Sequence, residues 1–208
     1  MNKKVIASGM IILILVLTGC TNAMSRSMNG NMNTNMGYAK PNHAVAQSIT
    51  GKESLESKFA FLSSANTNFC AGPAFINQKS DDDTLQGSCC SAMDLHRYKE
   101  QVDGLKKYSS INKIPLDPYD ISVSLAKELL AYQKNISLTS QQQMVYDEAV
   151  KLSPEKGPCC CKCWRYEAFA GLGKYLITEH NFNAQQVAEV WELLDGCGGK
   201  GHEHGMQA

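Results

Sequence analysis

Apolar residues recur every three or four positions through most of the chain beyond residue 50, which is the spacing of one face of an α-helix. The stripe is clear in five stretches, and a shorter stretch before them adds a sixth candidate. These stretches are 54–64, 95–105, 121–132, 145–152, 164–175 and 187–194. The pattern therefore predicts helices that each bury one side.

Polar residues at the ends of these stripes are typical of helix boundaries. Asp120 is predicted to cap the helix that starts at residue 121, and Asn183 to cap the last helix. Thr139 and Gln142 have the spacing of a capping box, in which each side chain binds the backbone N–H of the other residue. Gly196 stands where the last helix is expected to stop.

The chain shows no sustained alternation of period two and no internal repeat, so strands are not predicted. Residues 69–88 contain glycine, proline and three consecutive aspartates, and we expect them to form a loop. The predicted fold class is all-α, a small cysteine-rich helical bundle. We place this domain at residues 51–197.

The first 19 residues have the three parts of an export signal. Two lysines form a positive start, and residues 5–17 form an apolar stretch that is short for a membrane span. Residues 17–20 read Leu-Thr-Gly-Cys, which is the order of a bacterial lipobox, where the cysteine thiol receives the lipid. We therefore expect cleavage before Cys20. The product would be a lipoprotein held by acyl chains such as palmitate on the extracytoplasmic face of a cell membrane.

Two polar segments flank the predicted domain. Residues 20–50 are rich in Asn, Ser, Met and Gly and too poor in apolar residues to form a core, so they are predicted to be a flexible tether. Methionines recur there every fourth residue, either by chance in a low-complexity tract or as soft thioether ligands for Cu(I). These methionines are Met24, Met28, Met32 and Met36. Residues 198–208 form a Gly-rich tail with His202 and His204, which are either incidental or part of a metal-scavenging arm.

Composition excludes one class of partner and points to one kind of chemistry. The chain has 20 basic and 20 acidic residues, and loss of two lysines with the signal leaves 18 against 20. Because there is no basic stripe, nucleic acid is not an expected partner. Cysteine is abundant, with nine residues, of which eight remain beyond Cys20. Outside the membrane such thiols can form disulfides, and the sequence does not choose among the pairings.

The strongest chemical feature is at residues 158–163, which read Pro-Cys-Cys-Cys-Lys-Cys. The run stands directly before the fifth stripe, so it is predicted at the start of a helix. On a helix Cys159, Cys160 and Cys163 would lie near one another, whereas in an extended chain Cys159, Cys161 and Cys163 would share a side. In both cases three thiols converge, and a helix N-terminus stabilises their thiolate forms.

Three interpretations of this run remain open. Converging thiolates select soft ions such as Cu(I), Zn(II) or Hg(II). Alternatively, the cysteines form disulfides that staple a lipoprotein with a structural or interaction role. A redox C-x-x-C at residues 160–163 is the third, although the strand–helix context of a thioredoxin is missing. Attachment of a c-type haem is excluded, because it needs a histidine where Trp164 stands.

Five further residues belong to the candidate chemistry. Cys89 and Cys90 are adjacent, and adjacent cysteines more often pair outward or share a ligand set than bridge each other. His96 follows them on a predicted helix and is either a ligand or a surface residue. Cys70 and Cys197 are additional ligands or disulfide partners.

The run at residues 158–163 resembles the motif of the PCYCGC-motif lipoprotein family. Four of the six positions are identical, while Cys160 replaces the tyrosine and Lys162 replaces the glycine. The export signal also agrees with that family. The resemblance covers one hexapeptide, and it implies an exported cysteine-rich protein, a candidate metal binder, with no established reaction.

The sequence as a whole thus predicts a membrane-anchored, extracytoplasmic lipoprotein that is not an enzyme. We expect it to bind a soft metal ion, copper in preference to Zn(II). The expected ligands are Cys159, Cys160, Cys161, Cys163, Cys89, Cys90, His96, His202 and His204. The alternatives are a disulfide-stapled protein without metal and, less favoured, a thiol–disulfide oxidoreductase. No Ser-His-Asp set, phosphate loop or H-E-x-x-H motif indicates other chemistry, and no protein partner is indicated.

Overall fold

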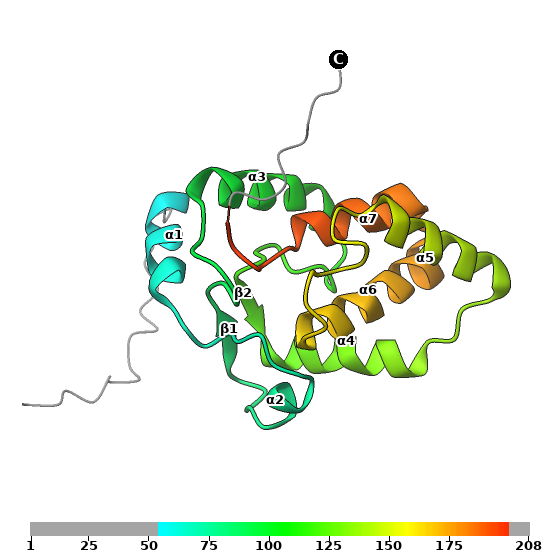
Figure 1. The fold of residues 1–208 in the computed structure, drawn as a ribbon, viewed down its shortest axis with the longest axis horizontal. Helices are drawn as coiled ribbons and strands as arrows, with labels where there is room; N and C mark the ends of the chain where they lie inside the picture. Colours follow the sequence, from blue (N-terminus) through cyan, green and yellow to red (C-terminus); the bar gives the residue numbers. More distant parts are fainter. Residues whose placement is uncertain (1–53, 200–208) are drawn as a thin grey trace, which may run out of the picture. The chain divides into compact units, whose positions relative to one another are not determined.

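The computed structural model of the protein describes residues 54–199 (Figure 1). This part is mostly helical, as predicted. Its elements are α1 (Leu55–Ser64), α2 (Ala74–Asn77), β1 (Thr84–Gln86), α3 (Leu95–Leu105), the 3-10 turn η1 (Lys106–Tyr108), β2 (Asp120–Ser122), α4 (Val123–Asn135), α5 (Ser140–Leu152), α6 (Trp164–His180) and α7 (Ala184–Leu193). The expected signal peptide, Cys20, the methionine tract, His202 and His204 lie outside the described residues. No helix within 54–199 is long and apolar enough to cross a bilayer.

Helix α6 forms the centre of the core. It contacts α4, α5 and α7 and is buried on nearly all its faces at the N-terminal end. Its contact with α4 is very close, because a Cβ at Gly171 would stand only 2.0 Å from the carbonyl oxygen of Leu129. Trp191 of α7 packs on the other side, and its indole N–H donates to the carbonyl of Phe169 at 2.8 Å. The long apolar stripe predicted over 164–175 is therefore the main core element.

Two of the predicted capping residues, Thr139 and Asn183, cap their helices in the structure. Thr139 and Gln142 form a capping box at the start of α5, with both reciprocal hydrogen bonds present. Asn183 and Gln186 form a second box at the start of α7. Ser54 accepts from the backbone N–H of Ser57 and caps α1, where the sequence indicated a further helix. These caps bind backbone N–H groups that have no partner inside the helix.

The helices are accompanied by one short sheet, and the described residues remain compatible with the all-α class. Strands β1 and β2 are antiparallel, with Leu85 opposite Ile121, and both residues are buried. The predicted loop over residues 69–88 thus contains a strand as well as the single turn of α2. Strands of three residues are too short to give a detectable alternation of polar and apolar positions.

The prediction that Asp120 caps the following helix is wrong. Asp120 lies in β2, where its carboxylate accepts from the Gln86 amide at 3.1 Å and pairs with Lys58 at 3.3 Å. Helix α4 begins two residues later than expected, and its N-cap is Ser122, whose hydroxyl accepts from the N–H of Leu125. A serine is as good a cap as an aspartate, so propensity alone does not separate the two.

The segment after α7 returns to the loop that precedes α3. Backbone hydrogen bonds join Cys89 N–H to the Gly196 carbonyl at 3.2 Å and Ser91 N–H to the Cys197 carbonyl at 2.8 Å. Gly199, at the start of the expected tail, also donates to the same loop. Figure 1 shows this segment in red, running back from α7 toward the strands.

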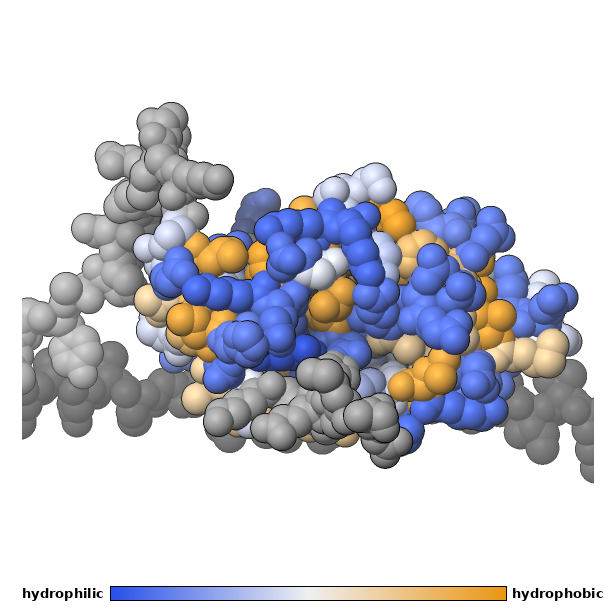
Figure 2. Space-filling model, turned by 90° about the horizontal axis from the view of Figure 1, so that it is seen from above, coloured by the Kyte–Doolittle hydropathy of each residue, from blue (hydrophilic) through white to orange (hydrophobic). Residues whose placement is uncertain are grey.

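The surface over this domain is mixed rather than uniformly apolar. Figure 2 shows one face on which hydrophilic residues cover most of the area and hydrophobic residues form separate patches. The large exposed hydrophobic side chains are likewise scattered over several elements. They are Phe61, Phe69, Leu116, Met144 and Leu152. Isolated apolar residues of this kind are normal on a soluble surface.

Candidate metal centre

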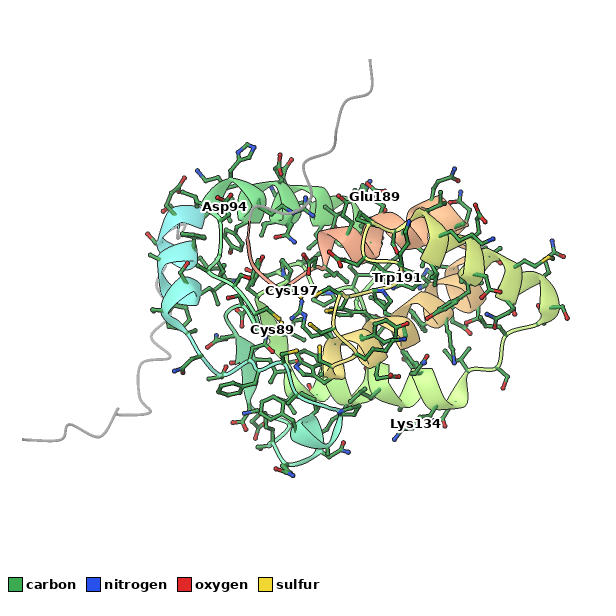
Figure 3. The ribbon with its side chains drawn as sticks, in the orientation of Figure 1. Cys89, Asp94, Lys134, Glu189, Trp191 and Cys197 are labelled. Carbon is green, nitrogen blue, oxygen red and sulfur yellow. The ribbon has the colours of Figure 1, made fainter. Side chains whose placement is uncertain are left out.

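The cysteines beyond Cys20 come from four separate parts of the fold and meet in one place. One follows α1, two lie in the loop before α3, four precede α6, and one follows α7. They are Cys70, Cys89, Cys90, Cys159, Cys160, Cys161, Cys163 and Cys197, and all eight are free thiols in the described chain. We call this group the cysteine cluster. Figure 3 shows Cys89 and Cys197 close together, where the returning segment passes the loop before α3.

Cys197 is the central sulfur of the inner half of the cluster. Its Sγ lies 3.4 Å from that of Cys159, 3.3 Å from that of Cys160 and 3.9 Å from that of Cys89. Cys159, Cys163 and Cys197 are buried together, with the ring of Tyr166 against them. The sequence indicated Cys197 only as an additional ligand, whereas the structure places three other sulfurs within 4 Å of its own.

The outer half of the cluster is more exposed. The Sγ of Cys90 lies 3.6 Å from that of Cys89 and 3.9 Å from that of Cys161. Cys161 in turn lies 3.4 Å from Cys160, which links the outer half to the inner half. Cys70, on the far side, belongs with Cys90 and Cys161. The thiols therefore form one continuous chain of sulfur contacts.

Three groups of three thiols are compact enough to hold an ion each. Within each group all Sγ atoms lie within 4.8 Å of one another. The outer group is Cys70, Cys90 and Cys161, the middle group is Cys89, Cys90 and Cys197, and the inner group is Cys159, Cys160 and Cys197. We refer to these as the outer, middle and inner triads. Two cysteines, Cys90 and Cys197, belong to two triads each.

The cysteine run adopts neither geometry that the sequence left open. Residues 158–163 are neither helix nor strand but an irregular turn, in which Cys163 N–H donates to the Cys161 carbonyl at 2.9 Å. Cys163 is the N-cap of α6, so the run stops where the helix begins. The turn places Cys159 and Cys160 toward Cys197, and Cys161 toward Cys90.

Trp164 fixes the position of the segment that carries Cys70. Its backbone N–H donates to the Ala71 carbonyl at 2.7 Å. Its indole N–H, fully buried, lies 3.2 Å from the Asn68 side-chain oxygen and from the Phe69 carbonyl. These three contacts bracket Cys70 on both sides and hold it next to the cysteine run.

Arg165 is a candidate site residue that the sequence did not indicate. Its side chain is 1% exposed, and its Nη2 donates to the carbonyls of Pro118 at 2.8 Å and Leu194 at 2.7 Å. The guanidinium also packs against Gly196, where a Cβ would stand 2.3 Å from Nη2. A signal for it existed, because Arg165 has the helical spacing of the apolar positions Ala168 and Leu172.

Electrostatics at the cluster favour ionised sulfur at two positions. Hydrogen bonds from Cys163 and Cys197 lower the pKa of Cys159, and a hydrogen bond from Cys197 lowers the pKa of Cys89 to about 7. The positive charge of Arg165 lowers both pKa values further. The donors respond in the opposite direction, since bonding to Cys159 raises the pKa of Cys163 and of Cys197. Thiolate is the form that binds soft metals.

The structure separates His96 and Cys163 from the triads. The His96 side chain is 85% exposed and its Nε2 lies 3.2 Å from the Glu100 carboxylate on the same helix, so the expectation that it joins the cysteines is not met. Cys163 contacts Cys159 but belongs to none of the triads found among residues 54–199. Cys160 and Cys161, by contrast, lie in triads as expected.

The sulfur separations bear on what the cluster can do chemically. The Sγ–Sγ distances of 3.3–3.9 Å are longer than the bond of about 2.05 Å in a disulfide. Three sulfurs at metal–sulfur bonds of about 2.3 Å would stand about 4 Å apart around a trigonal ion.

Comparison of the chain with protein-family models, curated proteins and solved structures gives no match. The function therefore has to be inferred from the cluster itself.

Proposed function

We propose that this protein is a lipoprotein, anchored through Cys20 on the extracytoplasmic face of a membrane, that binds soft metal ions and above all Cu(I). It acts as a binding protein without a reaction of its own. The observation that supports the proposal is the convergence of seven thiols into three compact triads from four segments of the fold. Thiolates are the protein ligands that select Cu(I) over harder ions.

The grouping by threes favours metal over disulfide staples. A disulfide needs two sulfurs and gains nothing from a third, whereas each triad brings a third sulfur within the same short range. The chain of sulfur contacts also contains two pairs of adjacent cysteines, Cys89–Cys90 and Cys160–Cys161. Cys89 and Cys90 share the middle triad, whereas Cys160 and Cys161 belong to the inner and outer triads, so each pair contributes both of its sulfurs to the triads.

The same grouping favours copper over zinc. Structural zinc is held by four ligands in a tetrahedron. Among the described residues, the compact groups of Cys, His, Asp and Glu contain three members each. Three soft sulfurs suit Cu(I), which accepts low coordination numbers and thiolate ligands. His202, His204 and the methionine tract would add soft or borderline donors that collect the ion before it reaches the cluster.

The proposal is tested on the full-length protein, purified in detergent without oxygen. Cu(I) is supplied as its acetonitrile complex, and the protein competes for it against a chromogenic Cu(I) chelator. We expect tight retention of copper and thiols that react with a thiol reagent only after the metal is stripped. Cys161→Ser and Cys197→Ser should each weaken retention, while His96→Ala, on an exposed residue away from the cluster, should leave it unchanged.

A different result would contradict the proposal. If protein prepared in air or under nitrogen binds no copper, and if its thiols are unreactive until a reductant is added, the cluster is a disulfide staple. Reduction should then destabilise the fold by about 2–5 kcal/mol per bridge. Turnover of a dithiol substrate by one cysteine would instead indicate an oxidoreductase.

A further inference from the structure

We propose that the cysteine cluster holds three Cu(I) ions as one polynuclear site, in which the sulfurs of Cys90 and Cys197 each bridge two ions. This inference rests on the proposed function and adds the number of ions and the identity of the bridges. It is carried by the overlap of the triads, since nine ligand places are filled by seven cysteines. Cys90 and Cys197 account for the difference, because each of them fills two ligand places.

The inner and outer triads differ in how far their cysteines are exposed to solvent. The inner triad contains Cys159 and Cys197, which are 3% and 8% exposed. The outer triad contains Cys70 and Cys90, which are both exposed. Cys160 of the inner triad is exposed, but the other two inner sulfurs are buried, so an ion would enter and leave most readily at the outer triad, and the inner ion would exchange last.

Thiolate sulfur is suited to this arrangement because it keeps lone pairs after binding one soft ion. Each of the seven thiols loses its proton to solvent as its first metal–sulfur bond forms, and the two bridges form a second bond without further proton loss. Copper enters and remains as Cu(I), so no electron is transferred. Seven thiolates and three monovalent cations leave a net charge of −4, because 3 − 7 = −4. The buried guanidinium of Arg165 lies next to the inner and middle triads and offsets part of that charge.

Cys163 is the matched control that the chain itself provides. It belongs to the same run, is buried and contacts Cys159, but it is in none of the triads of the described chain. A ligand role assigned by the sequence run alone would make it as important as Cys161. The overlap of the triads predicts instead that it holds no copper.

The experiment counts copper ions per chain by native mass spectrometry of the full-length protein. The wild-type chain and Cys163→Ser should retain three ions in the cluster. Cys70→Ser should retain two, because only the outer triad is broken, whereas Cys90→Ser and Cys197→Ser should each retain one. The double variant Cys90→Ser/Cys197→Ser breaks every triad, so any copper left on it is bound elsewhere and is subtracted throughout.

Two outcomes separate this inference from the proposed function. If wild-type protein holds a single ion in the cluster, or if Cys70→Ser and Cys197→Ser lose the same number, the bridged site is refuted and copper binding stands. If wild-type protein holds no copper, the proposed function fails as well. Circular dichroism checks that each variant is folded. X-ray absorption of the wild type gives a second measurement, since bridged ions show copper–copper scattering and isolated ions do not.

Discussion

At the scale of single residues, the position of Cys197 depends on the glycines around it. Gly198 has a φ of +84°, and a Cβ there would stand 2.1 Å from the carbonyl oxygen of Ser91. Gly196, on the other side, leaves room for the guanidinium of Arg165. In the sequence, Cys-Gly-Gly at residues 197–199 indicated the start of a tail. In the structure, the glycine at 198 allows the returning segment to pack against the loop before α3.

Gly198→Ala is expected to release Cys197 from the cluster. The left-handed backbone and the contact with Ser91 both oppose an added methyl group, so the returning segment should detach. The readout is the rate at which a maleimide labels Cys197, which should rise several-fold in the metal-free protein. Gly72→Ala is the control, because it also lies close to a cysteine but has open space around its Cβ position. Equal labelling rates in wild type and Gly198→Ala would contradict this reading of the glycine.

The sequence allowed part of the site to be predicted at this scale. The run at residues 158–163 and the pair Cys89–Cys90 are visible as local clusters, and both supply triad members. The importance of Cys197 was not predictable, because it arises from a return of the chain across the fold. The exclusion of His96 follows from its direction on α3, which the spacing along the sequence does not determine.

At the scale of elements, helices were predictable wherever a stripe and a cap agreed. Helices α5 and α7 combine apolar faces with predicted caps, and the structure confirms them, whereas α6 was predictable from its long apolar stripe alone. The region from residue 69 to 88 was not predictable, since its turn and strand are three or four residues long. Such short elements are stabilised by tertiary contacts, as with the ion pair that holds Asp120 in β2, rather than by local pattern.

The close contact of α4 and α6 gives a prediction for stability. Gly171→Ala should lower the free energy of unfolding by about 3 kcal/mol, because the new methyl group meets backbone atoms of Leu129 and Gln133 that cannot move without separating the helices. Gly104→Ala, in α3, is the matched control. There the methyl group meets only the end of the Leu193 side chain, and alanine favours the helix by about 0.5–1 kcal/mol. Denaturant unfolding of the metal-free variants measures both free energies of unfolding. An equal decrease in Gly171→Ala and Gly104→Ala would show that contact with the backbone is not the cause.

At the scale of the whole described domain, the cysteine cluster and the main apolar core are separate. The core gathers around α4, α6 and α7, whereas the cluster joins the loops that precede α3 and α6 and follow α1 and α7. Metal binding would therefore cross-link four loop segments that lie outside the helices. Those segments are the parts around Cys70, Cys89, Cys159 and Cys197.

Loading with Cu(I) is accordingly expected to stabilise the domain and to slow local opening at the cluster. Free ion at a hundred times its dissociation constant adds about 2.7 kcal/mol to the free energy of unfolding. Thermal unfolding should shift upward, and amide exchange should slow most in residues 88–92 and 158–163. Helix α5, which has no cysteine, serves as the internal comparison. Slowing of the same size in α5 would indicate a global effect in place of a local cross-link.

The return of Cys197 to the cluster also sets the time at which the site can exist. Cys197 follows Cys70 by 127 residues, because 197 − 70 = 127, and two of the three triads require it. The cysteine run alone supplies two members of the inner triad and one of the outer, which completes neither. If the chain crosses a membrane unfolded, its cysteines would therefore cross before the complete metal site has formed. The outer triad could fill before Cys197 arrives, but the middle and inner ions could be captured only after folding has brought Cys197 back to the cluster.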